Sequence, residues 1–320
     1  MAPIRTVLTE PSAAWRRAAA PWRITYAAGA TLMVVGAAHG MAWLVGGGAW
    51  DGPVSFRKPF NFGMSFGLTT ITLAWFADRL NLKRRVGWLL LVPLALANAT
   101  EVAWVSAQRA RGVASHFNVA TTFDMALYFV AGAGAIVVTT VVIVVLTVLA
   151  FTHRTDDPAL TLAIRAGFVL LLVAVAGGGT MIAVGNARAE AGQTHDLVQW
   201  GAAGNMRVTH FLGLHGMQVL AGLAVWLSAS TLHVATRTRI VAIGAAAYAG
   251  LLAAGTWQWL DGRALTQPGW LDGTLWVLSI VTLAAVAVIA LRAPPRCRRP
   301  RRGRVRSPQL SPEVHTSHRR

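Results

Sequence analysis

Residues 125–151 read MALYFVAGAGAIVVTTVVIVVLTVLAF, a run of 27 residues without a charged side chain. A helix needs roughly 20 apolar residues to cross a bilayer, and lipid tolerates no unpaired backbone polar groups. The run therefore predicts a transmembrane helix. Comparable runs lie at about 25–46, 59–77, 86–105, 166–187, 209–233, 240–260 and 272–291. We expect an all-α, polytopic membrane protein of about eight transmembrane helices, of which 59–77, short and beside Arg57 and Lys58, is the least secure.

The composition agrees with a membrane location. Apolar residues make up 55% of the chain and charged residues 13%, with a mean hydropathy of +0.51, whereas soluble domains carry about 25% charged residues. A membrane β-barrel would need alternating strands of roughly ten residues. The runs here are long and continuously apolar, so they favour helices over a barrel.

The net charge of +17 comes largely from one end of the chain. Residues 292–320 hold ten Arg and one Glu, so they contribute 10 − 1 = +9. This segment is rich in Pro, Ser and Arg and has no apolar periodicity, which is typical of disorder. Next to a membrane helix, such a tail predicts contact with anionic lipid and no nucleic-acid partner. The one cysteine, Cys297, lies in it and permits no intrachain disulfide.

The positions of Lys and Arg predict the orientation. Basic residues concentrate before the first run, around 79–85, 154–165 and 237–239, and in the tail. We therefore expect a bacterial inner-membrane protein with both termini in the cytoplasm. We read residues 25–46 as a retained helix, because that run is longer than a signal-peptide core. The expected organisation is an N-terminal segment 1–24, a four-helix half 25–151, a cytoplasmic connector 152–165, a second half 166–291 and the tail 292–320.

Polar residues recur at a nearly fixed distance, which indicates an internal repeat. The pairs are Lys58-Pro-Phe-Asn61-Phe62 with Arg207-Val-Thr-His210-Phe211 and Gly36-Ala-Ala-His39 with Gly185-Asn-Ala-Arg188, both at an offset of 149, and Gln108–Gly112 with Gln258–Gly262 at an offset of 150. With an even number of spans, the two halves would have the same orientation. The candidate polar residues would all lie at the outward end.

The sixth run opens with a histidine-rich stretch, Arg207-Val-Thr-His210-Phe-Leu-Gly-Leu-His215. Arg207 and His210 share one helical face. His210 and His215 are five apart, so they point about 140° from each other and cannot easily bind one metal from a straight helix. Ionisable groups within a membrane are expensive and indicate function. The alternative is that these histidines only bond backbone carbonyls at the interface.

Glu101 lies in an otherwise apolar run and is followed by Gln108, Arg111 and the loop Ser115-His116-Phe117-Asn118. A buried Glu must be protonated or paired, and Lys58, Arg111 and Arg207 are the available partners. Either Glu101 takes part in a site or it forms a structural ion pair. His116 is a candidate ligand or proton donor. Thr121, Thr122 or Asp124 can cap the start of the next helix, and for Asp124 we expect this structural role.

Two further residues complete the candidate set. His39 is either a second ligand opposite His215 or His116, or an interfacial histidine. Lys58, which precedes a proline, is either an interfacial anchor or part of a charged pocket. The candidate pocket residues are thus Lys58, Glu101, Arg111 and Arg207, and the candidate cofactor ligands His39, His116, His210 and His215.

These residues carry a resemblance. The Lys-Pro-x-x-Phe start at Lys58, the Arg-Gly-x-x-Ser-His-Phe-Asn loop at Arg111 and the His-Phe-x-Gly-x-His helix at His210 are similar to those of a group of polytopic bacterial membrane proteins without an established activity. The chain also resembles, more loosely, haem A synthase, which implies eight helices in two parallel halves with histidines near the outer surface. It departs from that pattern, because Arg188 replaces a partner of His39 and Asn61 stands opposite His210.

Three functions remain open. A redox protein would hold haem b between two imidazoles, or copper through His and Met, and exchange electrons with quinone. A transporter or sensor would bind a small anionic solute through Lys58, Arg111, Arg188 and Arg207, with Glu101 as a proton carrier. A scaffolding or assembly protein would use the same charges only as ion pairs. We expect an outward-facing His/Arg/Glu site, with haem or metal binding as the first hypothesis.

Overall fold

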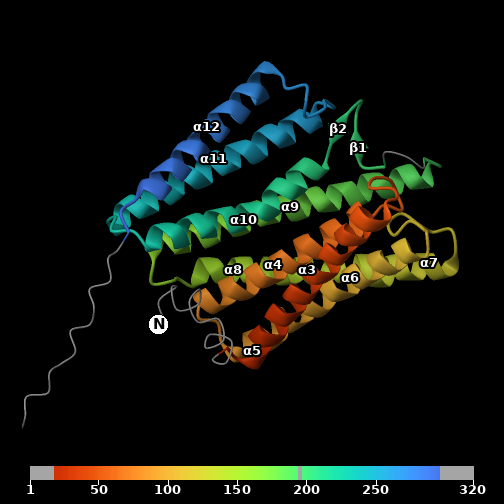
Figure 1. Cartoon of the computed structure of the whole chain (residues 1–320), viewed down its shortest axis with the longest axis horizontal. Helices are drawn as coiled ribbons and strands as arrows, with labels where there is room; N and C mark the ends of the chain where they lie inside the picture. The colour runs from red at the N-terminus through yellow and green to blue at the C-terminus, as the bar shows by residue number, and fades with distance from the viewer. Residues whose placement is uncertain (1–17, 194–196, 296–320) are drawn as a thin grey trace, which may run out of the picture.

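The computed structural model describes residues 18–193 and 197–295; most of the N-terminal segment, the basic tail and Cys297 lie outside this described part. The chain runs back and forth as a bundle of long helices (Figure 1). The all-α polytopic fold is confirmed. The principal helices are α3 (Ala20–Gly46), α4 (Arg57–Arg79), α6 (Val92–Ala110), α8 (Gly134–Thr152), α9 (Pro158–Glu190), α10 (Arg207–Ser228), α11 (Val234–Leu260) and α12 (Trp270–Arg292).

Two of the spans are composite. The span that directly follows α4 consists of α5 (Arg84–Val86), the π-helical segment η1 (Gly87–Leu91) and α6, and the next consists of α7 (Thr122–Leu127), η2 (Tyr128–Ala133) and α8. A π-turn inserts one extra residue per turn and is frequent at functional sites. η2 lies near the loop that carries His116.

Seven spans in the described residues are long and apolar enough to cross a membrane. Helix α4 is the eighth long helix but has a weaker apolar character, because it holds Asn61, Ser65 and several threonines. This is the run that the sequence marked as least secure. The chain is therefore a multi-pass membrane protein with seven apolar spans and one more polar helix packed among them.

The two ends of the bundle differ. One end, called the site end below, holds the loops 47–56, 111–121 and 261–269 and the described segments 191–193 and 197–206. The opposite end holds the loops 80–83, 153–157 and 229–233. Two short strands, β1 (Gln199–Trp200) and β2 (Gly204–Asn205), pair antiparallel in the site-end loop before α10. Both Ala20 and Arg292 lie at the opposite end, because the eight helices alternate in direction.

The helices pack in the same order twice. Helix α3 contacts α4 and α6, and α6 contacts α8; likewise α9 contacts α10 and α11, and α11 contacts α12. Small residues allow the closest contacts. A methyl group on Gly63 of α4 would lie 2.6 Å from the Cα atom of Gly36 on α3, so only glycine fits there.

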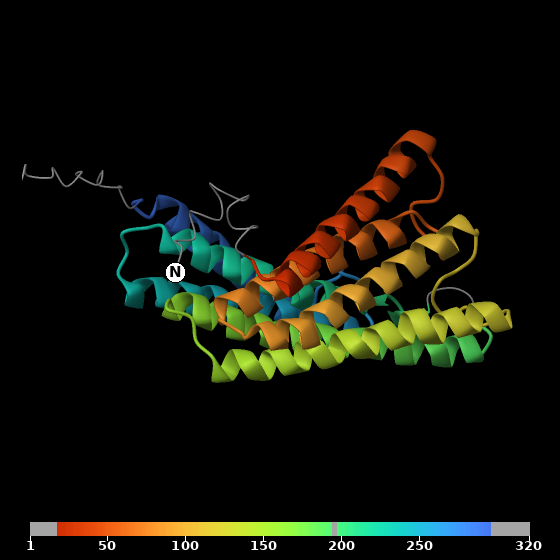
Figure 2. The ribbon, with the colours of Figure 1, turned by 90° about the horizontal axis from the view of Figure 1, so that it is seen from below.

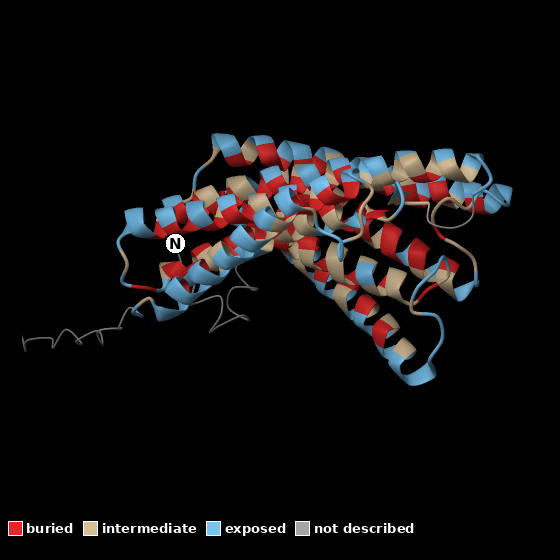
Figure 3. Ribbon diagram, turned by 90° about the horizontal axis from the view of Figure 1, so that it is seen from above, coloured by how far each residue is buried: buried red, intermediate tan, exposed pale blue. Residues whose placement is uncertain are grey.

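Exposed apolar side chains occur along the outer faces of the bundle, where Figure 3 shows exposed residues in pale blue. On α8, for example, Val141, Val144 and Val148 are exposed. Buried residues concentrate between the helices, with Leu73, Phe76 and Phe168 among those fully buried. An apolar outer face of this kind suits lipid and not water.

Helix α9 begins at Pro158, within the stretch 152–165 that the sequence predicted as a connector. The charge of Arg165 ended the apolar run, but the helix continues through it because the guanidinium bonds the carbonyls of Ala150 and Phe151 at the end of α8. Asp157 caps α9, accepting from the backbone N–H of Ala159 at 3.0 Å, and proline suits the first helical position. The connector is therefore 153–157.

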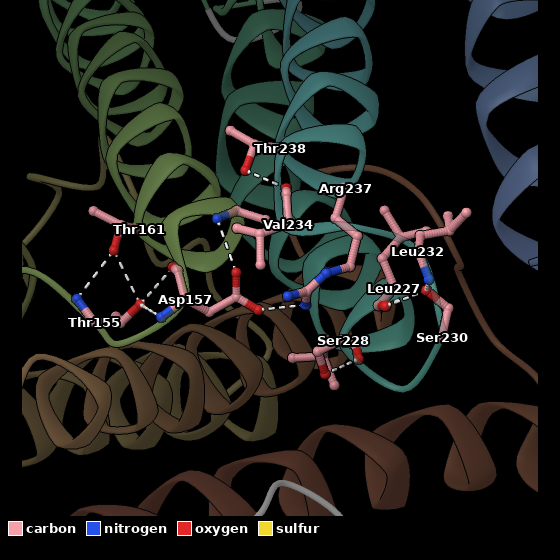
Figure 4. Close-up of polar contacts among 12 residues, drawn as sticks. Thr155, Asp157, Thr161, Leu227, Ser228, Ser230, Leu232, Val234, Arg237 and Thr238 are labelled. Carbon is pink, nitrogen blue, oxygen red and sulfur yellow. Dashed lines mark hydrogen bonds and ion pairs between the residues drawn. The ribbon is translucent and has the colours of Figure 1, made fainter. Parts of the chain in front are cut away.

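Asp157 also joins α9 to α11. The Nη1 atom of Arg237, a residue only 5% exposed, donates to Oδ2 of Asp157 at 2.7 Å (Figure 4). Thr155 and Thr161 bond each other beside this pair. The ion pair thus joins α9 to α11 at the end of the bundle that contains the loops 153–157 and 229–233.

Candidate functional site

One cavity of about 1520 Å³ lies between the first four and the last four long helices. Its walls come from α4, α6 and the loop 111–121 on one side and from α9 and α10 on the other, with α8 between them. Figure 2 shows α3, α4 and α6 leaning away from α8 and α9 towards the site end. The cavity occupies the region in which these helices diverge.

The cavity gathers most of the residues that the sequence singled out. Six of the eight candidates line it, and they come from both halves of the chain: Lys58, Glu101, Arg111, His116, Arg207 and His210. Asn61 and Asn118 line it as well. Residues separated by up to about 150 positions therefore share one polar compartment.

His39 and His215 do not line this cavity. The Nε2 atom of His39 lies 3.1 Å from the hydroxyl of Ser106 on α6. The ring of His215 packs against Phe211 with centroids 4.5 Å apart. The histidine ligand pair around His215 therefore stays a prediction, and neither histidine adds to this cavity.

The carboxylate of Glu101 is the most unusual group in the site. Its side chain is 1% exposed, and neither carboxylate oxygen has a hydrogen-bond partner within the described residues. The Nε2 atom of His116 lies 3.5 Å from its Oε1 atom, and the positive charge of Lys58 acts on the carboxylate from α4. A buried carboxylate without hydrogen bonds is costly, so Glu101 has to be protonated or paired with a positive charge.

His116 sits among aromatic rings. Its ring centroid lies 4.8 Å from that of Trp104, 5.4 Å from Phe62 and 6.3 Å from Tyr128. Burial, together with the positive charge of Lys58, lowers the pKa of His116 well below its ordinary value. His116 is therefore a neutral imidazole that can share a proton with Glu101.

The backbone beside His116 is strained. Phe117 has φ = 59°, a left-handed conformation that costs a residue with a side chain roughly 1–2 kcal/mol. Its ring packs directly against Gly185 on α9. Strain of this type persists where the surroundings over-determine a loop, often at functional sites.

Arg111 has a different partner from the one that the sequence suggested. Its Nη1 atom lies 2.6 Å from Oδ1 of Asp124, and Asp124 also accepts from Gln108 at 2.9 Å. Thr121 caps α7 by accepting from the backbone N–H of Asp124. Arg111 thus fixes the end of the loop 111–121, and Glu101 is left to His116 and Lys58.

On the other wall, α10 supplies Arg207 and His210. The Nδ1 atom of His210 lies 2.8 Å from the carbonyl oxygen of Ala174 on α9, so the other ring nitrogen remains for the cavity side. The backbone N–H of Arg207 donates to Asn205 at 3.1 Å. These contacts fix the start of α10. Arg207 and His210 both line the cavity, as their shared helical face predicts.

The lining changes from charged to apolar. At the site end the cations are Arg57, Lys58, Arg111 and Arg207 and the anions Asp51, Glu101 and Asp124, which gives 4 − 3 = +1 with neutral histidines. Further in, the walls hold Thr69, Thr139, Ile143, Val175 and Leu214. The cavity therefore has a charged part at the site end and a largely apolar part deeper between the helices.

Metal binding by clustered ligands has no support in the described residues. They contain no group of three or more His, Cys, Asp or Glu side chains that could hold a metal ion. A haem between two imidazoles would be restricted to His116 and His210, since these are the histidines that line the cavity. His116 is already enclosed by Trp104, Phe62 and Tyr128 and faces Glu101.

The aromatic side chains around His116 were not predicted from the sequence. Trp104 looked like part of an interfacial aromatic belt, yet it lies three residues after Glu101 and hence on the same helical face. Its indole Nε1 is buried without a partner in the described residues. Tyr128 belongs to η2 and donates to Asn186 of α9 at 2.8 Å, a contact between halves that no local pattern predicts.

Comparison of the chain with protein-family models, with curated proteins and with solved structures gives no significant match. The resemblances drawn from the sequence motifs therefore stay predictions, and the site has to be interpreted from its own geometry.

Proposed function

We propose that this multi-pass membrane protein binds an anionic amphiphile in the cavity between its two sets of helices. The head group would lie among Lys58, Arg207 and Asn61, and the apolar portion along α8, α9 and α10. The function would be reception or transfer of a membrane-derived molecule. This refines the solute-binding hypothesis and makes it preferable to haem or copper redox chemistry.

The lining gradient is the observation that carries the proposal. A cavity of about 1520 Å³ exceeds the roughly 300–1,000 Å³ that holds a drug-sized ligand, so a lipid-sized molecule fits. Its net charge of +1 favours a negative head, and its deeper walls offer threonine and aliphatic side chains. A small polar solute would leave those apolar walls uncovered.

The position of the cavity supports access from the bilayer. It lies between helices that diverge towards the site end and not inside one closed ring of helices. We infer that the site end faces away from the cytoplasm. Lys83, Arg84 and Arg85 lie at the opposite end, and loops rich in Lys and Arg stay cytoplasmic.

We also infer that the two sets of helices are related by duplication. Gln108 donates to the carbonyl of Ala114, and Gln258 donates to that of Ala264. Gly112 and Gly262 follow with φ of 73° and 71°. The shared turn falls where the sequence echo has an offset of 150, and the repeated packing order of the helices agrees with it.

The test is binding of lysophosphatidylglycerol with a fluorescent label on its acyl chain, followed by fluorescence polarisation on detergent-purified protein. Unlabelled lysophosphatidylglycerol should compete, whereas lysophosphatidylcholine, which has a zwitterionic head, and glycerol phosphate, which has no chain, should not. Lys58→Met should weaken binding about tenfold or more, because a contact to a charged group is lost.

The matched control is Lys83→Met, which changes the other lysine of the chain, exposed at the opposite end. It should leave the affinity within about twofold. Equal competition by both lysolipids would contradict an anionic head group. Competition by glycerol phosphate at similar concentration would assign the cavity to a small solute, and a Soret band in the purified protein would favour haem.

A further inference from the structure

We propose that Glu101 and His116 form a proton-binding site that takes up one proton when the anionic head group binds beside Lys58. This inference rests on the proposed function, because it concerns how the same cavity accepts a negative charge. The proton comes from solvent and is held by the carboxylate–imidazole pair. No covalent bond changes, so the step is a proton uptake linked to anion binding.

The first support is the unsatisfied state of Glu101. Its two oxygens are buried without a hydrogen-bond donor among the described residues, although His116 Nε2 lies only 3.5 Å away. A neutral imidazole can donate from one ring nitrogen only. A proton shared between the two groups would give the carboxylate a donor and turn the 3.5 Å contact into a hydrogen bond.

The second support is the electrostatic position of Lys58. It is the cation whose charge acts on Glu101, and it acts on His116 as well. An anion next to Lys58 would add a second negative charge near Glu101 in a medium of low dielectric constant. Uptake of a proton by Glu101 and His116 removes one of these negative charges, so it favours the bound state.

The other charged groups near the cavity leave Glu101 and His116 as the pair that can take up a proton when an anion binds. Glu101 acts electrostatically on Tyr128 of η2, and Arg207 from α10 acts on Lys58. Arg111 is engaged by Asp124, and Arg57 by Asp51. The cavity-lining residues of α8 and α9 within the described ranges carry no charge.

The enclosure around His116 keeps the imidazole itself neutral. Trp104, Phe62, Phe117 and Tyr128 cover most of the ring, and the nearby positive charge of Lys58 opposes a second positive charge on it. When a bound anion neutralises the positive charge of Lys58, that charge no longer opposes protonation of His116. Binding of the anion and of the proton are then mutually favourable, as linkage requires.

The experiment measures the affinity of the labelled lysophosphatidylglycerol between about pH 8 and about pH 5, a range in which histidine and shifted carboxyl groups titrate. Its phosphodiester keeps its charge throughout. If one proton is taken up per lipid, the affinity should rise by up to about tenfold per pH unit as the pH falls. Calorimetry in two buffers of different ionisation enthalpy should report up to one proton absorbed per lipid bound.

Glu101→Gln should retain lipid binding and lose the pH dependence and the proton uptake. Glu190→Gln, which removes an exposed carboxylate at the same end of the bundle, should keep both. His116→Gln provides a second test if Glu101→Gln does not fold. Lipid binding without pH dependence or proton uptake would overturn the coupling alone, whereas absence of lipid binding at every pH would overturn the proposed function.

Discussion

The ring of Phe117, held by a left-handed backbone, packs directly on Gly185 of α9, so the loop that carries His116 rests on a helix from the other half of the chain. The position of the His116–Glu101 pair therefore depends on a glycine almost seventy residues away. Tyr128 and Asn186 form a hydrogen bond from η2 to the same helix. Both contacts hold the two sets of helices together at the cavity.

Gly185→Ala should displace Phe117, because its new methyl group would overlap the aromatic ring. Overpacking of this kind costs roughly 1–3 kcal/mol of unfolding free energy. We expect an unfolding temperature several degrees lower, measured by intrinsic tryptophan fluorescence in detergent, together with weaker binding of labelled lysophosphatidylglycerol. Gly222→Ala is the matched control, since a methyl group there meets open space on the exposed face of α10. A Gly185→Ala protein with wild-type stability and binding would show that the loop does not need this support.

The Asp157–Arg237 pair offers a test at the opposite end of the bundle. Arg237 has a side chain 6% exposed and bonds Asp157 at 2.7 Å. Asp157→Asn keeps a residue suited to capping α9 but leaves a buried guanidinium without its counter-charge. Removing one partner of a buried pair typically costs about 3–5 kcal/mol, so the unfolding temperature should fall markedly. Adding Arg237→Met to that variant should recover part of the loss, and a double variant less stable than Asp157→Asn alone would contradict a dominant charge effect.

The helical architecture was predictable because the signal is local: each charge-free run is long enough to span a bilayer, whatever the rest of the chain does. The exceptions are the ends of helices, where Arg165 interrupts the apolar run but lies inside α9. Six candidate site residues also line one cavity. Polar side chains at the same end of neighbouring spans avoid lipid and therefore turn towards the interior of the bundle. The partners within that cavity were not predictable. Arg111 pairs with Asp124, and His116 lies beside Glu101. These contacts depend on the conformation of the loop 111–121, which contains the left-handed Phe117.

Histidine 116 should make the stability of the empty protein depend on pH. Burial and the charge of Lys58 hold its folded-state pKa well below its ordinary value. Below about pH 6.5 the unfolded chain therefore binds a proton that the folded protein resists. The unfolded state holds more protons, so the unfolding free energy falls as the pH falls, by up to about 1.4 kcal/mol per pH unit until the folded pKa is reached.

The measurement is the unfolding temperature of lipid-free protein between about pH 8 and about pH 5. His116→Gln should flatten the curve below about pH 6.5. His233→Asn is the control, because it replaces an exposed histidine at the start of α11 by another capping residue. A curve for His116→Gln that parallels the wild type would mean that position 116 does not titrate in this range.

The two matching turns allow a quantitative test of the duplication. Gln108 bonds the carbonyl of Ala114 and the carboxylate of Asp124, and Gln258 bonds the carbonyl of Ala264 and accepts from the indole of Trp276 at 3.1 Å. Each glutamine is fully buried. Because a hydrogen bond contributes about 1 kcal/mol and a buried group left unpaired costs about 1–3 kcal/mol, Gln108→Ala and Gln258→Ala should each lower the unfolding temperature by a similar amount. Only Gln108→Ala should also weaken lipid binding, since its turn leads into the loop that carries His116, whereas the turn after Gln258 lies outside the cavity. If one variant were neutral for stability and the other severely destabilised, the turns would share a geometry without sharing a structural role, and the case for related halves would lose its most specific support.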